Sequence, residues 1–280
     1  MSETGIASPG LNSASPQVPG LNLLLDVGGA LEADLERRFG ALRRLYGDAG
    51  YARLRAARVA VVGLGGVGSW AVEALARSGV AALVPIDLDQ IAESNINRQV
   101  QALSSTVGQA KVEALRARIA DIHPGCAVSA VEDFVSAENW PALLPGPVDV
   151  VIDACDQVRA KAALAAWALA SGVPLVCVGA AGGKRAAQRV EVADLSEVTH
   201  DPLLASLRQR LRKHHGAAGK GRIGLRCVFS RESVAPPADA CAADLGGSVP
   251  LSCHGYGSSV TVTATFGMVA AGEAVALLLA

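Results

Sequence analysis

The sequence predicts an α/β protein built on a Rossmann-like, doubly wound and mostly parallel sheet, with an irregular C-terminal extension. Three observations support this prediction. Short β-branched runs alternate with segments of helical periodicity over residues 59–179, and a glycine-rich turn joins the first run to the first helix. In addition, 51% of the 280 residues are hydrophobic and only 18% are charged, which is enough apolar material for one sizeable core or two small ones.

The first predicted unit is a strand, a turn, a helix and a second strand. Residues 59–63, Val-Ala-Val-Val-Gly, form a β-branched run that ends in glycine, and apolar residues follow at helical spacing over residues 66–78. Ser78 and Gly79 end this helix as a C-cap does, and residues 82–87 form the next apolar run. This order is typical of a βαβ unit in a parallel sheet.

The alternation continues through the middle of the chain. Apolar periodicity there predicts helices over residues 111–122 and 159–171, and strands over residues 127–131, 148–153 and 173–179. Beyond residue 183 the alternation of predicted strands and helices is less regular. We predict a strand over residues 189–193, a helix over residues 203–214 and a Pro- and Gly-punctuated loop over residues 236–257.

The last segment, residues 260–280, is apolar, and Glu273 is its only charged residue. Its length just reaches the roughly 20 residues that span a bilayer. Three threonines and two glycines make it only weakly hydrophobic. We therefore expect no stable membrane insertion and predict a buried helix that covers the sheet, since helices that are apolar all round also occur in the cores of larger domains.

The chain is predicted to divide into a tail and one domain. Residues 1–33 contain three prolines among serines and glycines and show no periodicity, which predicts a disordered N-terminal tail. Residues 34–280 are predicted to form a single domain, whose basic and loop-rich C-terminal part begins at about residue 184. No Lys or Arg precedes Arg37, and a signal peptide needs a basic n-region, so we expect a cytoplasmic protein.

The six cysteines form no C-x-x-C pair, so we expect reduced thiols and no structural zinc site. Cys253 and His254 lie in a stretch rich in Ser and Gly. We interpret them as ordinary loop residues, with a reactive thiol and a general base as the alternatives. The formal net charge is −1, so any attraction to nucleic acid must be local.

Gly63-Leu-Gly65-Gly66-Val-Gly68 fits G-x-G-x-x-G between a strand and a helix, which predicts a nucleotide-binding turn. Glycines let the backbone approach phosphates closely, and free N–H groups at the helix start favour negative charge. Asp87 ends the next strand about 20 residues further on, where a carboxylate can accept the hydrogen bonds of a ribose diol. Either NAD or ATP satisfies these features.

A polar cluster downstream of the second strand favours ATP. Arg98 and Lys111 supply positive charge for phosphate oxygens, and the side-chain amides near them can orient those oxygens. A dehydrogenase has no need of this cluster. The predicted nucleotide-binding residues in this part of the chain are Asp89, Asn95, Asn97, Arg98, Gln99 and Lys111.

Two further carboxylates follow a later strand. Asp153 ends the strand predicted over residues 148–153, and Asp156 comes three residues later. Because the carboxyl ends of parallel strands meet at one edge of the sheet, both are expected beside the glycine turn. Asp153 is assigned to the nucleotide site, and one of the two carboxylates is expected to hold Mg²⁺.

Together these motifs resemble the ubiquitin-activating-enzyme-like, ThiF-type adenylating superfamily, which includes the molybdopterin and thiamine sulfur-carrier activators. The resemblance implies that Asp87 binds the ribose of ATP. It implies that Arg98 and Lys111 bind phosphates and that Asp156 binds magnesium.

The same resemblance implies a homodimer in which an arginine upstream of the first strand reaches the ATP of the partner subunit. Arg38 and Arg44 both occupy that region. Arg44 is the candidate that we include among the catalytic residues, with Arg38 as the alternative.

Other segments resemble one family of that superfamily, the tRNA threonylcarbamoyladenosine dehydratases. The resemblance implies adenylation of a threonine carboxylate on an adenosine beside the tRNA anticodon, followed by ring closure with loss of water. Sulfur-carrier activators usually bear two C-x-x-C zinc pairs, and the absence of such pairs here favours the dehydratases. The segments that carry the resemblance are residues 38–40, 44–47, 65–70, 201–203, 227–230 and 262–267.

Three alternatives stay open. An activator of a ubiquitin-like sulfur carrier protein would release AMP in response to a carrier that ends in Gly-Gly, and sulfur-transfer proteins would then be its partners. An NAD-dependent oxidoreductase would bind NAD instead of ATP. A noncatalytic nucleotide-sensing module that binds tRNA would bind ATP without turnover.

Residues 208–226 contain seven basic residues and no acidic one. We interpret this segment as a tRNA phosphate-binding surface, and the alternative is a solvated helix face and loop. The basic residues are Arg208, Arg210, Arg212, Lys213, Lys220, Arg222 and Arg226.

Overall fold

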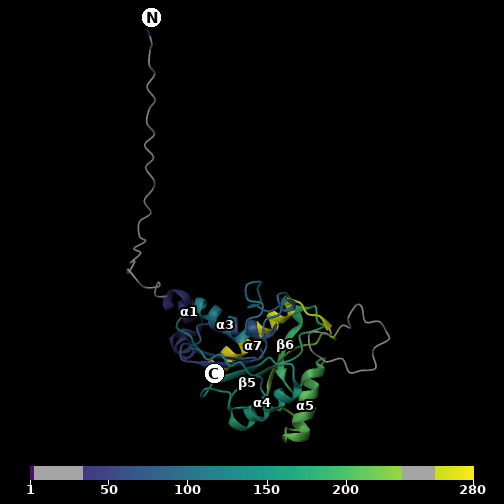
Figure 1. Ribbon diagram of the computed structural model, residues 1–280. Coiled ribbons are helices and arrows are strands. Elements are labelled where there is room, and N and C mark those ends of the chain that lie inside the picture. The colour runs from purple at the N-terminus through teal and green to yellow at the C-terminus, as the bar shows by residue number, and fades with distance from the viewer. Residues whose placement is uncertain (3–33, 235–255) are drawn as a thin grey trace, which may run out of the picture. The chain divides into compact units, whose positions relative to one another are not determined.

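A seven-stranded sheet with the strand order β3-β2-β1-β4-β5-β7-β6 forms the centre of the domain (Figure 1). The computed structural model describes residues 1–2, 34–234 and 256–280. Neighbouring strands are parallel except β6, which runs antiparallel to β7 at one edge. The predicted fold class is therefore confirmed. The strands are β1 (Arg58–Val62), β2 (Ala82–Ile86), β3 (Ala127–Val128), β4 (Val150–Asp153), β5 (Leu175–Val178), β6 (Val190–Asp194) and β7 (Arg226–Ser230).

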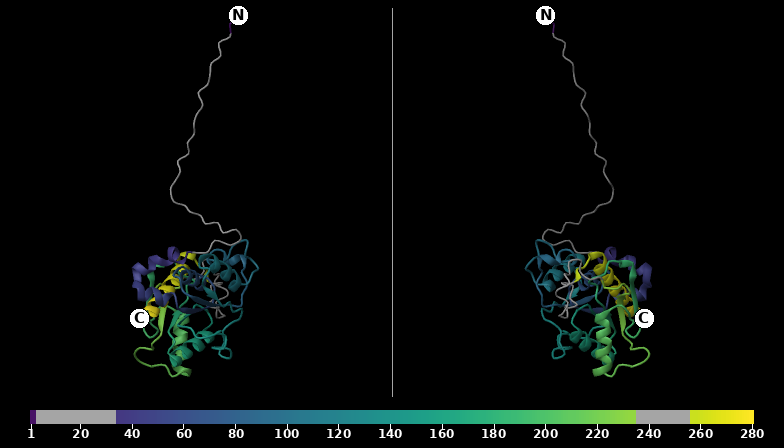
Figure 2. Two further views of the ribbon diagram at one scale, coloured as in Figure 1. Left: turned by 90° about the vertical axis from the view of Figure 1, so that its left-hand side faces the viewer. Right: turned by 90° about the vertical axis from the view of Figure 1, so that its right-hand side faces the viewer.

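Helices cover both faces of this sheet, as a doubly wound fold requires. One face packs against α2, α3 and α7, and the other packs against α4 and α5. The side views show α1 and α7 on one side of the sheet and α5 on the other (Figure 2). The helices are α1 (Leu35–Leu54), α2 (Gly68–Arg77), α3 (Lys111–Ile122), α4 (Val158–Ser171), α5 (Pro202–His214) and α7 (Val260–Leu279), with short 3₁₀ turns η1 (Glu93–Asn95) and η2 (Ala187–Arg189).

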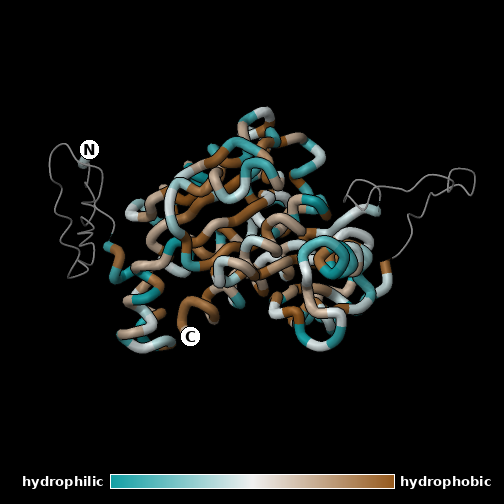
Figure 3. The backbone as a smooth tube through the Cα atoms, turned by 90° about the horizontal axis from the view of Figure 1, so that it is seen from below, coloured by the Kyte–Doolittle hydropathy of each residue, from teal (hydrophilic) through white to brown (hydrophobic). Residues whose placement is uncertain are grey.

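The central strands are apolar at consecutive positions because both of their faces are covered. In β1, Val59 and Val61 belong to the apolar cluster on the α2 side, whereas Ala60 and Val62 belong to the cluster on the α4 side. Brown, apolar segments accordingly run through the middle of the domain (Figure 3). Burying a valine side chain contributes roughly 1.5–3 kcal/mol, so this double layer supports a rigid sheet edge on which a site can be built.

The turn between β1 and α2 requires glycine at two positions. Gly63 has a φ of +83°, which L side chains rarely adopt. A Cβ on Gly68 would overlap the carbonyl oxygen of Gly63. The glycines of the motif therefore let the chain reverse direction within six residues and start α2 directly above the end of β1.

Three elements differ from the sequence-based prediction. The helix α1 was not expected, because few of its positions are apolar; it is anchored by the buried residues Phe39, Tyr51 and Leu54. The strand β7 was also not expected, and it lies between β5 and β6. The predicted strand over residues 127–131 is shorter, since Val131 only forms an isolated bridge with Ile86.

The apolar C-terminal helix α7 is long and apolar enough to cross a membrane by length and composition alone. In the domain it packs against α2 and against β4 and β5. The prediction of a helix that covers the sheet is thus confirmed. Its buried face consists of Val262, Thr263, Phe266, Gly267, Ala270, Ala271, Ala274 and Val275.

Several predictions fall on residues 3–33 and 235–255, which lie outside the described residues. These are the N-terminal tail, most of the loop over residues 236–257, and the interpretations of Cys253 and His254. They stay predictions.

Candidate functional site

A cavity of about 360 Å³ lies at the carboxyl ends of β1, β2, β4 and β5. The strand order reverses there, because β2 and β3 lie on one side of β1 whereas β4 and β5 lie on the other. Open α/β sheets bind their ligands at such a switch point. Of the residues predicted for the site, those that line the cavity are Gly63, Gly65, Gly66, Asp87, Asp89, Arg98, Gln99, Lys111 and Asp156.

The glycine turn presents backbone amides to this cavity. Gly63 donates its N–H to the carbonyl oxygen of Ile86 at 2.9 Å, which joins the turn to β2. Within the described residues, the amides of Gly65 and Gly66 have no acceptor. Free amides at the start of a helix attract anions, so the turn is suited to phosphate oxygens. Gly68 does not line the cavity, and its role is to make the turn possible.

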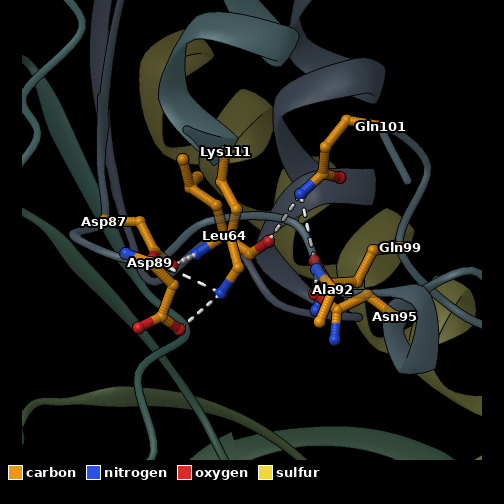
Figure 4. Close-up of polar contacts among 8 residues, drawn as sticks. All are labelled: Leu64, Asp87, Asp89, Ala92, Asn95, Gln99, Gln101 and Lys111. Carbon is orange, nitrogen blue, oxygen red and sulfur yellow. Dashed lines mark hydrogen bonds and ion pairs between the residues drawn. The ribbon is translucent and has the colours of Figure 1, made fainter. Parts of the chain in front are cut away.

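Asp87, Asp89 and Lys111 form a compact charged group at the end of β2 (Figure 4). The Asp87 carboxylate accepts hydrogen bonds from the amide of Leu64 at 2.6 Å and from the amide of Asp89 at 2.8 Å. The Lys111 ammonium lies 2.6 Å from a carboxylate oxygen of Asp89 and 3.4 Å from one of Asp87. Its side chain is only 6% exposed, so these acidic groups hold a nearly buried cation beside the cavity.

Arg98 reaches the cavity from the segment that follows η1. The indole N–H of Trp70 donates to the carbonyl oxygen of Arg98 at 2.9 Å, which fixes its backbone to α2. The guanidinium donates to the carbonyl oxygen of Ser94 at 2.7 Å and to the side-chain oxygen of Asn97 at 3.0 Å. Both acceptors are neutral, so an anion in the cavity would be a stronger partner for the guanidinium.

Gln99 and Gln101 support the glycine turn from within. Gln101 was not predicted. Its side-chain amide donates to the carbonyl oxygen of Leu64 at 3.0 Å and to the Gln99 side-chain oxygen at 3.1 Å (Figure 4). Both glutamines are buried. No spacing rule in the sequence relates Gln101 to the glycine motif 37 residues earlier, and only the folded structure brings them together.

Asn95 and Asn97 do not line the cavity, contrary to the prediction that they orient phosphates. The Asn95 side-chain oxygen accepts a hydrogen bond from the amide of Ala92 at 3.1 Å, and this residue is buried. Asn97 donates to the carbonyl oxygen of Ser258 at 3.1 Å, just before α7. Their side chains therefore shape the segment that carries Arg98.

Asp153 and Asp156 have different environments. Asp156 is exposed and lines the cavity. Asp153 is fully buried, does not line the cavity, and pairs with the Lys161 ammonium at 3.1 Å. Along β4 the side chains alternate between the two faces, and Asp153 points to the α4 side, which is why it cannot face the nucleotide. Of the two carboxylates considered for Mg²⁺, Asp156 has the suitable position.

No group of three or more His, Cys, Asp or Glu side chains in the described part of the chain is arranged to hold a metal. Mg²⁺ in nucleotide sites is commonly held by one or two carboxylates together with substrate phosphates. The exposed carboxylate of Asp156 at the cavity fits that pattern.

An apolar wall beside Asp87 was not predicted. It includes Leu88, Phe134 and Val135, and the first two side chains are 47% and 55% exposed. Large exposed apolar side chains at a cavity suit a flat, apolar ligand group such as a nucleobase. The sequence carries no motif at Phe134, which lies in a loop after β3.

Neither candidate arginine of α1 lines the cavity. Arg38 donates to the carbonyl oxygens of Asp121 and Ile122 at the end of α3, at 2.8 and 2.7 Å. Arg44 is exposed and makes no hydrogen bond or ion pair with the described residues. Of the two, Arg44 is the one whose guanidinium the described residues do not engage.

The basic segment divides into engaged and exposed residues. Arg208 donates to the carbonyl oxygens of Leu195 and Val198, and Arg226 pairs with Glu273 at 2.9 Å. These two arginines have structural contacts, which the sequence did not indicate. The other basic side chains lie on the last turns of α5 and in the loop after it. Arg212 donates to the carbonyl oxygen of Ala218 at 3.0 Å, and Arg222 lies 4.0 Å from a carboxylate oxygen of Asp194. These two are exposed, as are Lys213 and Lys220, whereas Arg210 is half-buried.

Comparison with known proteins identifies close relatives. The model of the ThiF family matches residues 38–280. The tRNA threonylcarbamoyladenosine dehydratase of Escherichia coli (strain K12) is 43% identical over 252 residues, which cover 87% of this chain and 94% of that protein. The Haemophilus influenzae enzyme of the same name is 41% identical over 249 residues, with the same coverage.

A solved structure shares the fold. The Escherichia coli tRNA N6-threonylcarbamoyladenosine dehydratase in complex with ATP superposes with a TM-score of 0.79 at 40% identity, and the match covers 88% of this chain and 96% of that one.

Proposed function

The chain belongs to the ThiF family and, within it, to the tRNA threonylcarbamoyladenosine dehydratases, and we propose that it uses ATP to adenylate and cyclise threonylcarbamoyladenosine in tRNA. One observation carries the proposal: the free amides of the glycine turn, Asp87, Lys111 and Asp156 meet at a single cavity. The ATP complex of the similar Escherichia coli enzyme supports ATP over NAD as the ligand.

The cavity residues have separate tasks in this proposal. The amides of Gly65 and Gly66 donate to phosphate oxygens, and Asp87 accepts hydrogen bonds from the ribose. Arg98 turns from its two neutral acceptors toward the phosphates, because charged phosphate groups attract a cation more strongly than a carbonyl oxygen does. Lys111 contacts the phosphates from its place beside Asp87 and Asp89. Leu88 and Phe134 provide the apolar surface for the adenine.

We assign magnesium to Asp156. The ion would be held by this carboxylate together with phosphate oxygens, and when bound it would neutralise charge that develops on the leaving pyrophosphate. Asp153 has no part in this site, because its charge is already paired with Lys161.

The reaction then has two steps. An oxygen of the threonine carboxylate attacks the α-phosphorus of ATP, and the bond to pyrophosphate breaks. A nucleophile of the same modified nucleoside next attacks the activated carbonyl, and AMP leaves. Well-oriented intramolecular reactions reach effective molarities of roughly 10⁵–10⁸ M, so ring closure needs no protein nucleophile. The Cys155 thiol lines the cavity, but burial raises its pKa well above the usual value, and it stays protonated.

The remaining partners follow from the same proposal. Exposed basic residues at the end of α5 and after it would contact tRNA phosphates. A homodimer would bring Arg44 of one subunit to the ATP of the other. We place the enzyme in the cytoplasm, where ATP and tRNA are available. Sulfur-transfer proteins are proposed as further partners.

Mass spectrometry of tRNA nucleosides tests the proposed function. Purified protein is incubated with tRNA that carries threonylcarbamoyladenosine, with and without MgATP. Loss of one water from the modified nucleoside in the MgATP sample alone is the expected result. AMP release that depends on a carrier protein ending in Gly-Gly, with unchanged tRNA, would instead identify a sulfur-carrier activator, and binding of NAD in place of ATP would identify an oxidoreductase.

A further inference from the structure

The start of α7 brings to the cavity a residue that no motif in the first half of the chain accounts for. Thr263 lines the cavity, and the residue is only 1% exposed. Its side-chain oxygen is buried and has no hydrogen-bond partner among the described residues. Buried hydroxyls are normally satisfied, because an unpaired polar group loses its bonds to water without replacement.

Tight packing between α7 and α2 determines the position of this hydroxyl. Gly267 lies one turn after Thr263, where a Cβ would overlap the carbonyl oxygen of Val67 and lie 2.9 Å from the Cβ of Trp70. Only glycine allows the two helices to approach so closely. One turn earlier, Thr263 therefore rests on the glycine turn itself, and a Cβ on Gly66 would lie 3.2 Å from the Cβ of Thr263.

Arg98 shares this contact. A Cβ on Gly66 would also lie 3.1 Å from Cγ of Arg98, so Gly66, Arg98 and Thr263 meet at one point of the cavity. In this structure the guanidinium is directed to Ser94 and Asn97. An anion that draws the guanidinium to this point would also lie beside Thr263.

The N-terminus of α7 also favours an anion at this point of the cavity. α7 begins at Val260, with Ser259 as its N-cap, and Thr263 lies in the first turn of this 20-residue helix. The N-terminus of an α-helix carries a partial positive charge that favours anions. An unpaired hydroxyl and a helix N-terminus thus converge on the position next to the amides of the glycine turn.

We propose that the Thr263 hydroxyl donates a hydrogen bond to an anionic oxygen bound in this cavity, either a phosphate oxygen of ATP or the carboxylate oxygen of the substrate. The inference rests on the proposed function, since both anions are its reactants. It makes Thr263 a binding residue contributed by the last helix of the domain, about 200 residues after the glycine motif.

The test uses Thr263→Val, which removes the hydroxyl and keeps the branched shape, and Thr263→Ser, which keeps the hydroxyl. Thr265→Val is the matched control, because Thr265 lies on the same helix, does not line the cavity, and donates its hydroxyl to the carbonyl oxygen of Thr261 at 2.7 Å. Calorimetry measures the affinity for ATP alone. AMP formation with modified tRNA at saturating ATP measures the later step.

A hydrogen bond to a charged group predicts a loss of about tenfold in Thr263→Val, which Thr263→Ser restores and Thr265→Val does not show. A loss of ATP affinity assigns the hydroxyl to a phosphate, and a loss confined to AMP formation assigns it to the substrate carboxylate. Thr263→Val should also melt at the temperature of the parent or above it, because it removes an unpaired buried hydroxyl; a purely structural hydroxyl would give a lower melting temperature.

Parent-like ATP affinity and AMP formation in Thr263→Val would overturn the inference and leave the proposed function intact. A parent protein that neither binds ATP nor forms AMP would overturn the proposed function, and the inference with it.

Discussion

Lys161 and Asp153 form a fully buried ion pair beneath the cavity, with 3.1 Å between the ammonium nitrogen and a carboxylate oxygen. Although burial opposes the charge of Lys161, the Asp153 carboxylate raises its pKa above the usual value. The same carboxylate accepts a hydrogen bond from the amide of Cys155 at 3.2 Å. The pair therefore positions the turn that carries Asp156 to the cavity.

Replacing Lys161 with methionine should lower the free energy of unfolding by about 3–5 kcal/mol, because it leaves the Asp153 carboxylate buried without a counter-ion. Urea denaturation measures the change. A second variant with both Lys161→Met and Asp153→Asn should recover most of the loss, since neither remaining side chain is charged. Equal destabilisation of the single and double variants would show that the ammonium acts through packing alone.

Asp156→Asn should abolish AMP formation and leave the melting temperature unchanged. The exposed carboxylate contributes to magnesium capture and makes no hydrogen bond or ion pair with the described residues. AMP formation and thermal unfolding are measured on the same preparation. Asp121→Asn, which changes an exposed carboxylate near the C-terminal end of α3 and outside the cavity lining, is the control. Near-normal turnover in Asp156→Asn would remove this residue from the site.

Arg98→Ala and Lys111→Ala should each reduce AMP formation by roughly 10²-fold or more if their side chains contact the transferring phosphates. Arg116→Ala, which removes an exposed cation from α3, is the control. The two residues differ in one expected respect. Lys111 neutralises Asp87 and Asp89 in the absence of ligand, so only Lys111→Ala should also destabilise the protein. Activity close to that of the parent would show that neither side chain contacts the transferring phosphates.

The sequence predicts the positions of most strands and helices because apolar periodicity and glycine turns are local signals. It places Gly63, Asp87 and Lys111 correctly at one edge of the sheet, since the ends of parallel strands must meet there. Alternation along a strand also indicates on which face of the sheet each side chain lies. Asp153 follows Ile152, which faces α2, so its side chain must point to the α4 side.

Contacts across long stretches of chain were not predictable in this way. Gln101 supports Leu64, and Thr263 packs on Gly66, only because the crossover segment and α7 fold back onto the glycine turn. The helix α1 was missed for a different reason. It holds the domain by a few anchors such as Phe39, and it has no continuous apolar stripe.

The stability of the domain should decrease below pH 6.5 because of His123. Burial, with help from Arg55 and Arg38, lowers its pKa to about 4. The unfolded chain therefore binds a proton between pH 6.5 and 4 that the folded protein rejects, and stability is lost as the pH falls through this window. The loss at pH 5 should be about 2 kcal/mol relative to pH 8. Urea denaturation of the parent and of His123→Gln at both pH values isolates this contribution, and equal pH dependence in the two proteins would contradict it.

The last prediction concerns the basic residues at the end of α5 and after it. Neutralising four of them together should weaken tRNA binding and flatten its salt dependence, because each lost phosphate contact removes about 0.9 or less from the slope of log K against log salt. The affinity for ATP should stay unchanged, since none of these side chains lines the cavity. Filter binding of tRNA at several salt concentrations measures the affinity for tRNA and its salt dependence. A variant lacking Arg37 and Arg116 controls for the change in net charge. If the slope per removed charge is the same in both variants, the segment is a solvated face and the RNA contact lies elsewhere on the domain. The four residues are Arg210, Arg212, Lys220 and Arg222.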